Sequence, residues 1–236
     1  MATITVVGLG PGPLSQMTQE AEQHLRGAAK VFFRASTYPA YDWLHGLGKS
    51  LVSFDGLYSM PWPDATAMYE FMVTALLREV SLRDEVTFAL PGSPLVLEDT
   101  VQILKARGPA AGVDIRIIHG LSFVEIALAA VDFDFKVPLQ VVLPRLHLQN
   151  GLFDSRGALL VCQPQATGQP TEAARIDLTV DWLQRRYPAD HPVVLIWTSG
   201  LPTYKTEHAT VPLAELARAY GDGKYYASLF VPPLVA

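Results

Sequence analysis

Three short loops carry the residue types that could hold a small ligand. They read GLGPG at residues 8–12, LPGSP at residues 90–94 and HGLS at residues 119–122. Glycine tolerates a positive φ or a close approach of the backbone, and proline removes a backbone N–H donor. The second loop therefore offers mostly carbonyl oxygens and the hydroxyl of Ser93, which suits a cation better than a phosphate. An ordinary turn from a strand to a helix is the competing interpretation of that loop taken alone.

Each loop lies between a short apolar run and a helical pattern. The runs are typical of buried strands and cover residues 3–7, 86–90 and 114–118. The helical patterns that follow cover residues 15–25, 95–107 and 123–131. Ligands bind open α/β sheets where the strands end, and right-handed crossovers bring parallel strand ends to one edge. We therefore expect the three loops to gather along one edge of a single parallel sheet.

A change in the sequence pattern near residue 132 predicts two domains. The stretch DFDFKVP at residues 132–138 is typical of a crossover between lobes, and shorter, more β-rich segments follow it. We expect an N-terminal α/β lobe at residues 1–132 with a parallel-type sheet, and a C-terminal α/β lobe at residues 133–236 with a mixed sheet. In the second lobe, strands are expected at residues 139–143, 158–163, 193–198, 207–211 and 225–231, and helices at residues 171–186 and 213–220.

The composition is that of a well-packed globular protein, with 50% hydrophobic and 17% charged residues. The net charge of −5 and the lack of clustered Lys and Arg argue against a nucleic-acid surface. No apolar run is long enough to span a membrane, and the N-terminus enters a strand without the features of a signal peptide. A cytoplasmic location is therefore expected. The single cysteine, Cys162, excludes an internal disulfide and a Cys-based zinc site, and no metal site is expected.

The first loop matches the dinucleotide-binding fingerprint only in part. Pro13 occupies the position of the third glycine, and Pro11 and Pro13 lack the N–H groups that would hold a pyrophosphate. A further predicted strand, residues 30–34, ends in Arg34, where an NAD enzyme would carry Asp or Glu. An NADP-dependent oxidoreductase, in which Arg34 contacts the 2′-phosphate, stays open as an alternative.

Five motifs in this order resemble those of the tetrapyrrole (corrin/porphyrin) methylase family. They are ITVVGLGPG at residues 4–12, PGSP at 91–94, GLS at 120–122, LLVCQ at 159–163 and SLFVPPLV at 228–235. The resemblance spans nearly the whole chain. It is strongest to the methylase-like module that lies N-terminal to MazG-type nucleotide pyrophosphohydrolases in YabN-like bacterial proteins.

The resemblance implies an S-adenosylmethionine-dependent methyltransferase with a cofactor cleft between two α/β lobes, a small-molecule substrate and usually a homodimer. Matching by motif assigns cofactor contacts to ten residues. They are Pro11, Pro91, Gly92, Ser93, Val96, Ser122, Phe123, Gln163, Ser199 and Gly200.

The methyl acceptor is left unassigned because the chain departs from the family pattern at several positions, among them Ser93 and Arg34. Ser93 stands where many members carry Asp, and Arg34 stands where the uroporphyrinogen methylases carry an acidic residue. The alternative function is a non-catalytic S-adenosylmethionine-binding or regulatory module that serves a MazG-type pyrophosphohydrolase. This chain has no EExxE-like helix that could hold Mg²⁺ for nucleotide hydrolysis.

No catalytic residue is assigned from the sequence. The candidates for a general base are His119, Tyr38 and Tyr204, and the cations that could pair with an anionic acceptor are Arg34, Arg145 and Lys205.

Overall fold

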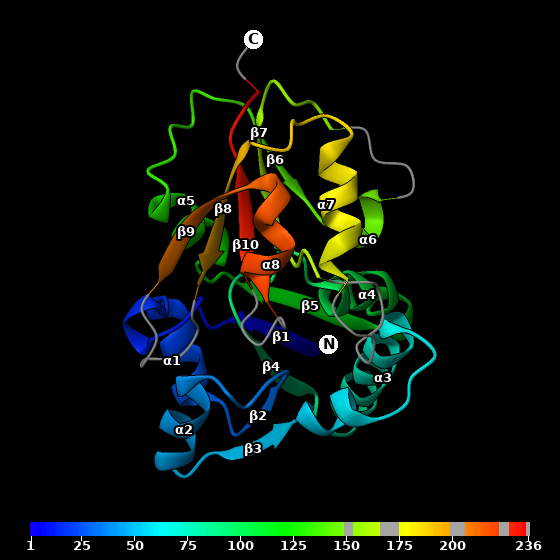
Figure 1. Cartoon of the computed structure of the whole chain (residues 1–236). Helices are drawn as coiled ribbons and strands as arrows, with labels where there is room; N and C mark the ends of the chain where they lie inside the picture. Colours follow the sequence, from blue (N-terminus) through cyan, green and yellow to red (C-terminus); the bar gives the residue numbers. More distant parts are fainter. Residues whose placement is uncertain (149–152, 166–174, 199–205, 222–226, 235–236) are drawn as a thin grey trace. The chain divides into compact units, whose positions relative to one another are not determined.

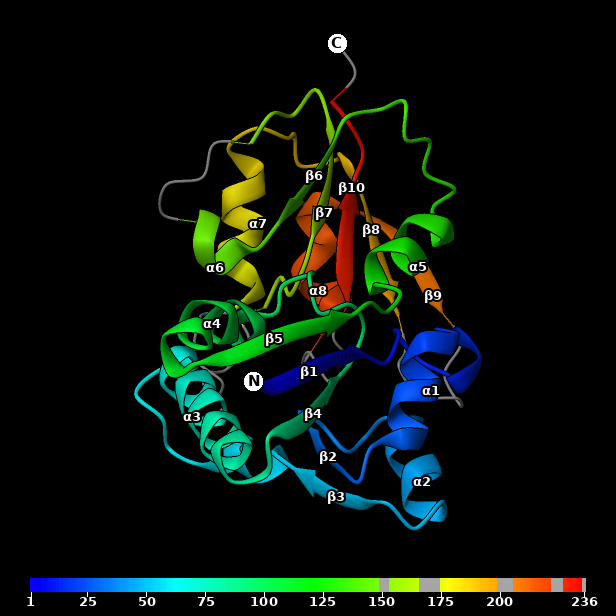
Figure 2. The same cartoon turned by 180° about the vertical axis from the view of Figure 1, so that it is seen from behind.

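The computed structural model describes residues 1–148, 153–165, 175–198, 206–221 and 227–234. These residues form two compact units, the first made by Met1–Phe123 and the second beginning at Val124. Each unit consists of a five-stranded sheet with helices packed on it, which confirms the expected α/β class (Figures 1 and 2). The compact units divide after Phe123, and the domain boundary expected at residue 132 stays a prediction.

The sheet of the first unit has five parallel strands in the order β3-β2-β4-β1-β5. The strands are β1 (Ala2–Gly8), β2 (Lys30–Phe33), β3 (Ser50–Ser53), β4 (Glu85–Leu90) and β5 (Val113–Ile118). Gly8 at the end of β1 lies opposite Leu90 at the end of β4, and Val7 lies opposite Ile118 at the end of β5. The carboxyl ends of these three strands therefore meet at one edge of the sheet, as the sequence predicted.

Helices cover both faces of this sheet. α1 (Gln19–Gly27) and α2 (Pro39–Gly46) pack on one face, while α3 (Ala65–Arg83) and α4 (Asp99–Arg107) pack on the other. Successive strand residues point to opposite faces, so Val6 packs in the core under α3 and α4 and Val7 in the core under α1 and α2. Burial on both faces explains the nearly continuous apolar runs of the central strands. Three short 3₁₀ turns, η1 (Leu14–Gln16), η2 (Asp55–Ser59) and η3 (Pro109–Ala111), complete this unit.

The sheet of the second unit is mixed, as expected, with the order β6-β7-β10-β8-β9. β6 (Leu139–Val142) runs parallel to β7 (Ala158–Val161), and the pairs that involve β10 (Ser228–Val231), β8 (Pro192–Trp197) and β9 (Glu207–Pro212) are antiparallel. The helices of this unit are α5 (Phe123–Ala130), α6 (Pro144–His147), α7 (Ile176–Gln184) and α8 (Leu216–Tyr220), and η4 (Leu213–Glu215) leads into α8.

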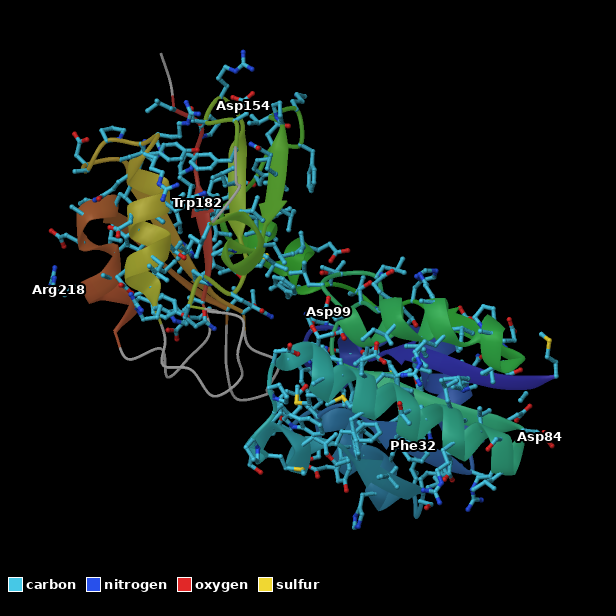
Figure 3. The ribbon with its side chains drawn as sticks, turned by 90° about the vertical axis from the view of Figure 1, so that its right-hand side faces the viewer. Phe32, Asp84, Asp99, Asp154, Trp182 and Arg218 are labelled. Carbon is cyan, nitrogen blue, oxygen red and sulfur yellow. The ribbon has the colours of Figure 1, made fainter. Side chains whose placement is uncertain are left out.

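α7 and α8 pack on one face of the second sheet around the fully buried Trp182. The ring of Trp182 meets Phe153 edge to face at 4.6 Å between centroids, a favourable arrangement for two aromatic rings. Figure 3 shows Trp182 among the side chains of this unit and Phe32 among those of the first unit. Within the described ranges, no helix has both the length and the apolar character that crossing a membrane requires.

Two sequence-based predictions were wrong in the first unit, each for a local reason. The helix expected from residue 95 begins at Asp99, because Leu97 adopts a left-handed φ of 57° that cannot continue a helix. The helix expected from residue 15 begins at Gln19, where the Thr18 side chain accepts a hydrogen bond from the Ala21 N–H and so caps the helix. Strand β3 was not predicted at all.

Candidate functional site

The three predicted loops meet at a junction of glycines at the carboxyl edge of the first sheet. A Cβ atom placed on Gly8 would lie 2.6 Å from the backbone nitrogen of Gly120 and 2.7 Å from the carbonyl oxygen of Gly92. A Cβ on Gly120 would overlap the same Gly92 oxygen and the Gly8 backbone. Only glycine fits at Gly8 and Gly120, so the loops that follow β1, β4 and β5 touch through their backbones.

Two backbone hydrogen bonds join the first and second loops. The Gly92 N–H donates to the Gly10 carbonyl at 2.8 Å, and the Gly10 N–H donates to the Gly92 carbonyl at 3.2 Å. Both glycines have left-handed φ angles, 78° at Gly10 and 68° at Gly92. Among the described residues, an added Cβ at Gly92 would meet only the Leu121 oxygen, at 4.0 Å, so these residues leave the space beside Gly92 open. The junction is therefore rigid backbone with room beside Gly92.

The second loop turns back on itself at Ser93. The Val96 N–H donates to the Ser93 carbonyl at 3.2 Å, and the Leu95 N–H donates to the Ser93 hydroxyl at 3.3 Å. The hydroxyl thus stabilises the turn, and its remaining hydrogen-bonding capacity is a donor and one lone pair. Beyond Val96 the loop passes through the left-handed Leu97 and ends at Glu98, the residue that precedes α4.

Glu98 belongs to a buried polar cluster that the sequence did not reveal. Nη1 of Arg34, at the end of β2, contacts both carboxylate oxygens of Glu98, and the two side chains are 16% and 9% exposed. Nε of Arg34 donates to the Tyr58 hydroxyl at 2.9 Å, and Nη2 donates to the Tyr69 hydroxyl at 3.3 Å. The Thr100 hydroxyl donates to Glu98 at 3.4 Å. The charge of Arg34 is therefore balanced inside the first unit.

The environment of Glu98 changes its proton affinity. Burial disfavours the carboxylate and outweighs the nearby Arg34, so the pKa of Glu98 rises from its ordinary value of 4.5 to about 7. Burial likewise raises the pKa of the Tyr69 and Tyr38 phenols, although Arg34 opposes the rise in both. The charge of Glu98 therefore changes near neutral pH. In the sequence, a single glutamate before a helical pattern is interpreted as an ordinary residue of the first helical turn. The one signal for a buried role of Glu98 was that Arg34, if buried, would need an anionic partner.

The predicted cofactor residues fall on both units. Pro11 and Ser122 are buried in the first and third loops, and residues 91–93 and Val96 lie in the second loop. Phe123 begins α5 at the end of the first unit. Gln163 follows β7 in the second unit, where it is exposed and has an unusual positive φ of 50°. Ser199 and Gly200 lie outside the described residues.

The candidates for a general base and for anion binding are only partly described. The His119 side chain is exposed, and its carbonyl accepts a hydrogen bond from the Thr18 hydroxyl at 3.2 Å. Tyr38 is disfavoured as a base at neutral pH, because the raised pKa of its phenol keeps it protonated. Tyr204, Lys205 and the side chain of Arg145 lie outside the described parts of the chain.

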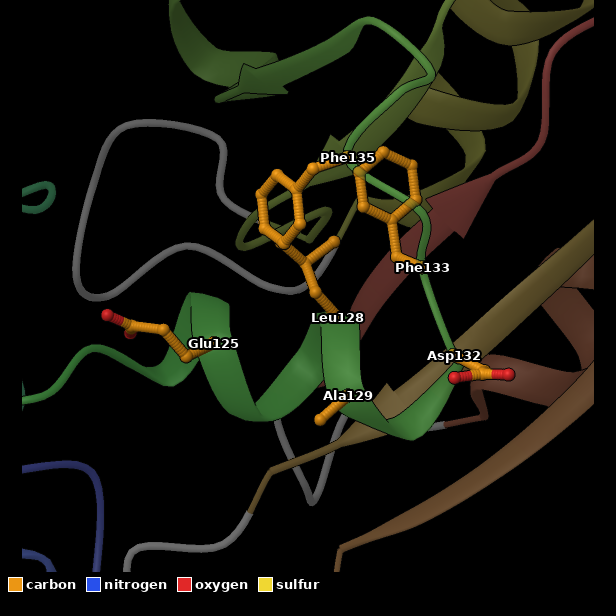
Figure 4. Close-up of a pocket in the computed structure, with 6 residues that line it drawn as sticks. All are labelled: Glu125, Leu128, Ala129, Asp132, Phe133 and Phe135. Atoms are coloured by element: carbon orange, nitrogen blue, oxygen red, sulfur yellow. The ribbon is translucent and has the colours of Figure 1, made fainter.

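A small hollow in the second unit does not coincide with the predicted residues. It has a volume of about 190 Å³ and is lined by Glu125, Leu128, Ala129, Asp132, Phe133 and Phe135. Figure 4 shows Leu128 pointing from α5 toward the ring of Phe135. The rings of Phe133 and Phe135 meet edge to face at 5.2 Å between centroids, and Phe135 is 74% exposed.

The chemistry available at the glycine junction is that of backbone dipoles and hydroxyl groups. Among the described residues, no group of three or more His, Cys, Asp or Glu side chains is placed to hold a metal ion. Cys162 lies in the buried core of the second unit, and burial raises the pKa of its thiol to about 12, which makes it a poor nucleophile. Carbonyl oxygens at the edge of a parallel sheet suit a ligand that carries positive charge.

Comparison with known proteins gives a family match over most of the chain. The family described as Tetrapyrrole (Corrin/Porphyrin) Methylases matches residues 3–217. The chain is also 31% identical over 231 residues to the uncharacterized protein YabN of Bacillus subtilis (strain 168). This alignment covers 98% of the chain and 45% of YabN, so the chain spans about half the length of that relative.

Two solved structures share the fold at low sequence identity. Uroporphyrin-III C-methyltransferase from Thermus thermophilus superposes with a TM-score of 0.74 at 18% identity, covering 99% of this chain and 95% of that one. A structure of uroporphyrin-III C-methyltransferase from the same organism, in complex with S-adenyl homocysteine, gives a TM-score of 0.70 at 17% identity. Here 98% of this chain and 97% of the other are covered.

Proposed function

Because the chain belongs to the tetrapyrrole (corrin/porphyrin) methylase family, we propose that it is an S-adenosylmethionine-dependent methyltransferase whose acceptor is still to be identified. The observation that carries the proposal is the junction of Gly8, Gly92 and Gly120, where three strand ends meet through backbone alone. Such an edge is where α/β sheets bind ligands. Its carbonyl oxygens and the open space beside Gly92 suit the positively charged end of the cofactor.

The cofactor contacts proposed for this chain include residues of both units. In the first unit, Gly92 would approach the ligand through its backbone, and Ser93 and Ser122 would supply hydroxyl groups. Pro11 is buried beside the Gly10–Gly92 bridge and would fix the shape of the first loop. The full proposed set is Pro11, Pro91, Gly92, Ser93, Val96, Ser122, Phe123, Gln163, Ser199 and Gly200.

The bound cofactor would supply an electrophilic methyl group on a sulfonium. The methyl carbon would form a bond to the acceptor nucleophile as its bond to sulfur breaks, and the electron pair of that bond would stay on sulfur. For such a displacement the protein mainly holds the two reactants in line, at about 3–3.5 Å, which can lower the barrier by roughly 7–11 kcal/mol. A proton on the acceptor would leave to a base or to water, and this chain's described residues point to no single base.

Among the described residues of the first unit, the loops at this edge carry no lysine and no arginine other than Arg34 that could pair with an anionic acceptor. Arg34 is already bonded to Glu98, Tyr58 and Tyr69. The loop segments at residues 8–15, 34–39, 54–64, 91–98 and 119–122 contain no lysine and no arginine besides Arg34. The part of the acceptor that meets these described loops would therefore find no lysine or arginine partner besides Arg34. The same pairing speaks against an NADP-dependent oxidoreductase, because a 2′-phosphate would need the guanidinium of Arg34.

The proposal is tested by calorimetric titration of S-adenosylmethionine and S-adenosylhomocysteine, with NADPH as the comparison ligand. We expect micromolar binding of both sulfur compounds. The Gly92→Trp variant would fill the open space and should weaken binding by roughly a hundredfold or more, about 3 kcal/mol. The matched control is Gly112→Trp, since Gly112 also has a left-handed φ, 70°, and an added Cβ there would have no atom of a described residue within 4 Å. It lies at the amino end of β5, the end opposite the loops, so binding should be retained.

A wild-type chain that binds neither sulfur compound, or a Gly112→Trp control that loses binding as fully as Gly92→Trp, would contradict this assignment. A protein that binds both compounds but methylates nothing in an acceptor screen would favour the non-catalytic module. The partner that we propose for such a module is a MazG-type pyrophosphohydrolase. A homodimer and a cytoplasmic location are further parts of the proposal, and light scattering of the purified protein tests the dimer.

A further inference from the structure

The loop between β4 and α4 is anchored at both of its ends, and the two anchors differ in kind. At the start, Gly92 is bridged to Gly10, and Pro94 packs so closely that a Cβ on Gly8 would lie 2.6 Å from its Cδ atom. At the other end, Glu98 is held by Arg34 from the end of β2. The segment between the anchors contains Ser93 and Val96, two of the proposed cofactor contacts. Its shape is therefore set by a backbone bridge on one side and by an ion pair on the other.

The end held by Glu98 carries local strain. Leu97 has a φ of 57°, a conformation in which the Cβ of an L-residue crowds the following carbonyl oxygen. Such a residue keeps this conformation only where its neighbours hold it there, and observed outliers of this kind are concentrated at functional sites. The neighbour that holds Leu97 on its C-terminal side is Glu98. The Glu98 carbonyl also accepts the Val101 N–H at 3.1 Å and the Gln102 N–H at 3.3 Å, so this residue fixes the start of α4 as well.

A buried ion pair is a costly way to hold a loop. Both charges lose their contact with water, and apolar residues of the same volume often stabilise a fold at least as well. The pair instead fixes where the end of the loop lies, because a carboxylate bonded to a planar guanidinium has a defined position and direction. The guanidinium is in turn fixed by Tyr58 and Tyr69, and its carbon lies 5.3 Å from the centre of the Tyr69 ring.

We infer that Arg34 and Glu98 are positioning residues that hold the 91–98 loop in its cofactor-binding shape, so that cofactor affinity depends on the ionised Glu98–Arg34 pair. This inference rests on the proposed function for its affinity readout. The titratable groups around the Glu98–Arg34 pair are Tyr58 from η2, Tyr69 from α3, Asp99 from α4 and Tyr38 before α2, and Arg34 itself directly follows β2. Arg34 is the cation of this cluster. Asp99, in the first turn of α4, is labelled in Figure 3.

The first test measures S-adenosylhomocysteine affinity of the wild-type protein between pH 5.5 and pH 8.5. Because the charge of Glu98 changes near neutral pH, affinity should rise with pH, by on the order of tenfold. Glu98→Gln should abolish this rise and bind on the order of tenfold more weakly at pH 8.5. The control is Glu70→Gln, which removes another Arg–Glu pair of the same unit, Arg107–Glu70 at 2.5 Å. That pair joins α3 to α4 away from the loop, so the pH dependence should remain.

A second variant separates positioning from stability. Replacing both partners by methionine, Arg34→Met with Glu98→Met, removes the buried charges together and should leave the unfolding temperature near that of the wild type. Affinity should nevertheless stay reduced on the order of tenfold, because the directed contact is gone. An affinity that recovers together with the unfolding temperature would overturn the inference, since the pair would then serve stability alone.

A readout without ligand keeps this inference distinct from the proposed function. In the free protein at pH 8.5, where Glu98 is ionised, amide hydrogen exchange at Val96 and Val101 should be faster in Glu98→Gln than in the wild type, while exchange at Gly10 should be unchanged. If the wild type binds no S-adenosylhomocysteine, the proposed function fails, and the exchange result alone decides the positioning role. Exchange rates at Val96 and Val101 that match the wild type would overturn it.

Discussion

Replacing Glu98 by glutamine should change how the stability of the protein depends on pH. Glutamine keeps the size and shape of the side chain but does not titrate. In the folded wild type, burial raises the pKa of Glu98 from 4.5 to about 7, so the native state holds a proton more tightly than the unfolded chain. The native state thereby gains stability relative to the unfolded chain while that proton is bound.

The sign and size of the effect follow from this difference. Below pH 4.5 both states hold the proton, and the stabilising contribution of Glu98 is fully present. Between pH 4.5 and pH 7 the unfolded chain has released the proton and the native state retains it, so the free energy of unfolding falls as the pH rises. Above pH 7 the contribution is lost. A pKa raised from 4.5 to about 7 corresponds to roughly 3 kcal/mol over this range.

The assay is urea unfolding at half-unit steps from pH 4.5 to pH 8, followed by tryptophan fluorescence and circular dichroism. The free energy of unfolding of the wild type, minus that of Glu98→Gln, should decrease by about 3 kcal/mol across the series. Glu70→Gln is the control, because the Glu70 side chain is 45% exposed and keeps its contact with water. A wild-type minus Glu98→Gln difference that stays constant with pH, or that grows as the pH rises, would refute the reasoning.

Three further predictions concern packing and reactivity. Gly120→Ala should destabilise the first unit by about 1–3 kcal/mol, because its Cβ would overlap the Gly92 oxygen. Thermal unfolding should show this loss but none for Gly46→Ala, where no atom of a described residue lies within 4 Å of an added Cβ. Trp182→Ala should cost about 3–5 kcal/mol in the second unit, measured by urea unfolding with circular dichroism, and a smaller cost would mean that the site collapses around the shorter side chain. Cys162 should resist iodoacetamide at pH 8 until denaturant is added, since its pKa is about 12, and labelling of the native protein would show that the thiol is accessible.

The sequence carried enough information to predict the framework of the site. Gly8, Gly92 and Gly120 were recognisable because each follows an apolar run and precedes a helical pattern, and such positions meet at one edge of a parallel sheet. The mixed second sheet was likewise predictable from its short strands. These features depend on local pattern and on general rules of topology, which a single sequence contains.

The features that were missed depend on tertiary contacts. β3 lies in a segment rich in proline and glycine, and its four residues form a strand because β2 supplies a partner along its length. The late start of α4 depends on the left-handed Leu97, a conformation that its residue type disfavours. Arg34 and Glu98 are separated by a long stretch of chain, so their pairing is visible only after β2 and β4 lie side by side.

The glycine junction also has a consequence for the order of events in folding. The bonds between Gly10 and Gly92, and the contact of both loops with Gly120, join residues that are far apart in the chain. Such long-range contacts form slowly, because the intervening chain must first be brought together. The junction therefore closes only when β1, β4 and β5 have all paired. During refolding, the ability to bind ligand should therefore return late, after the parallel sheet of the first unit is complete.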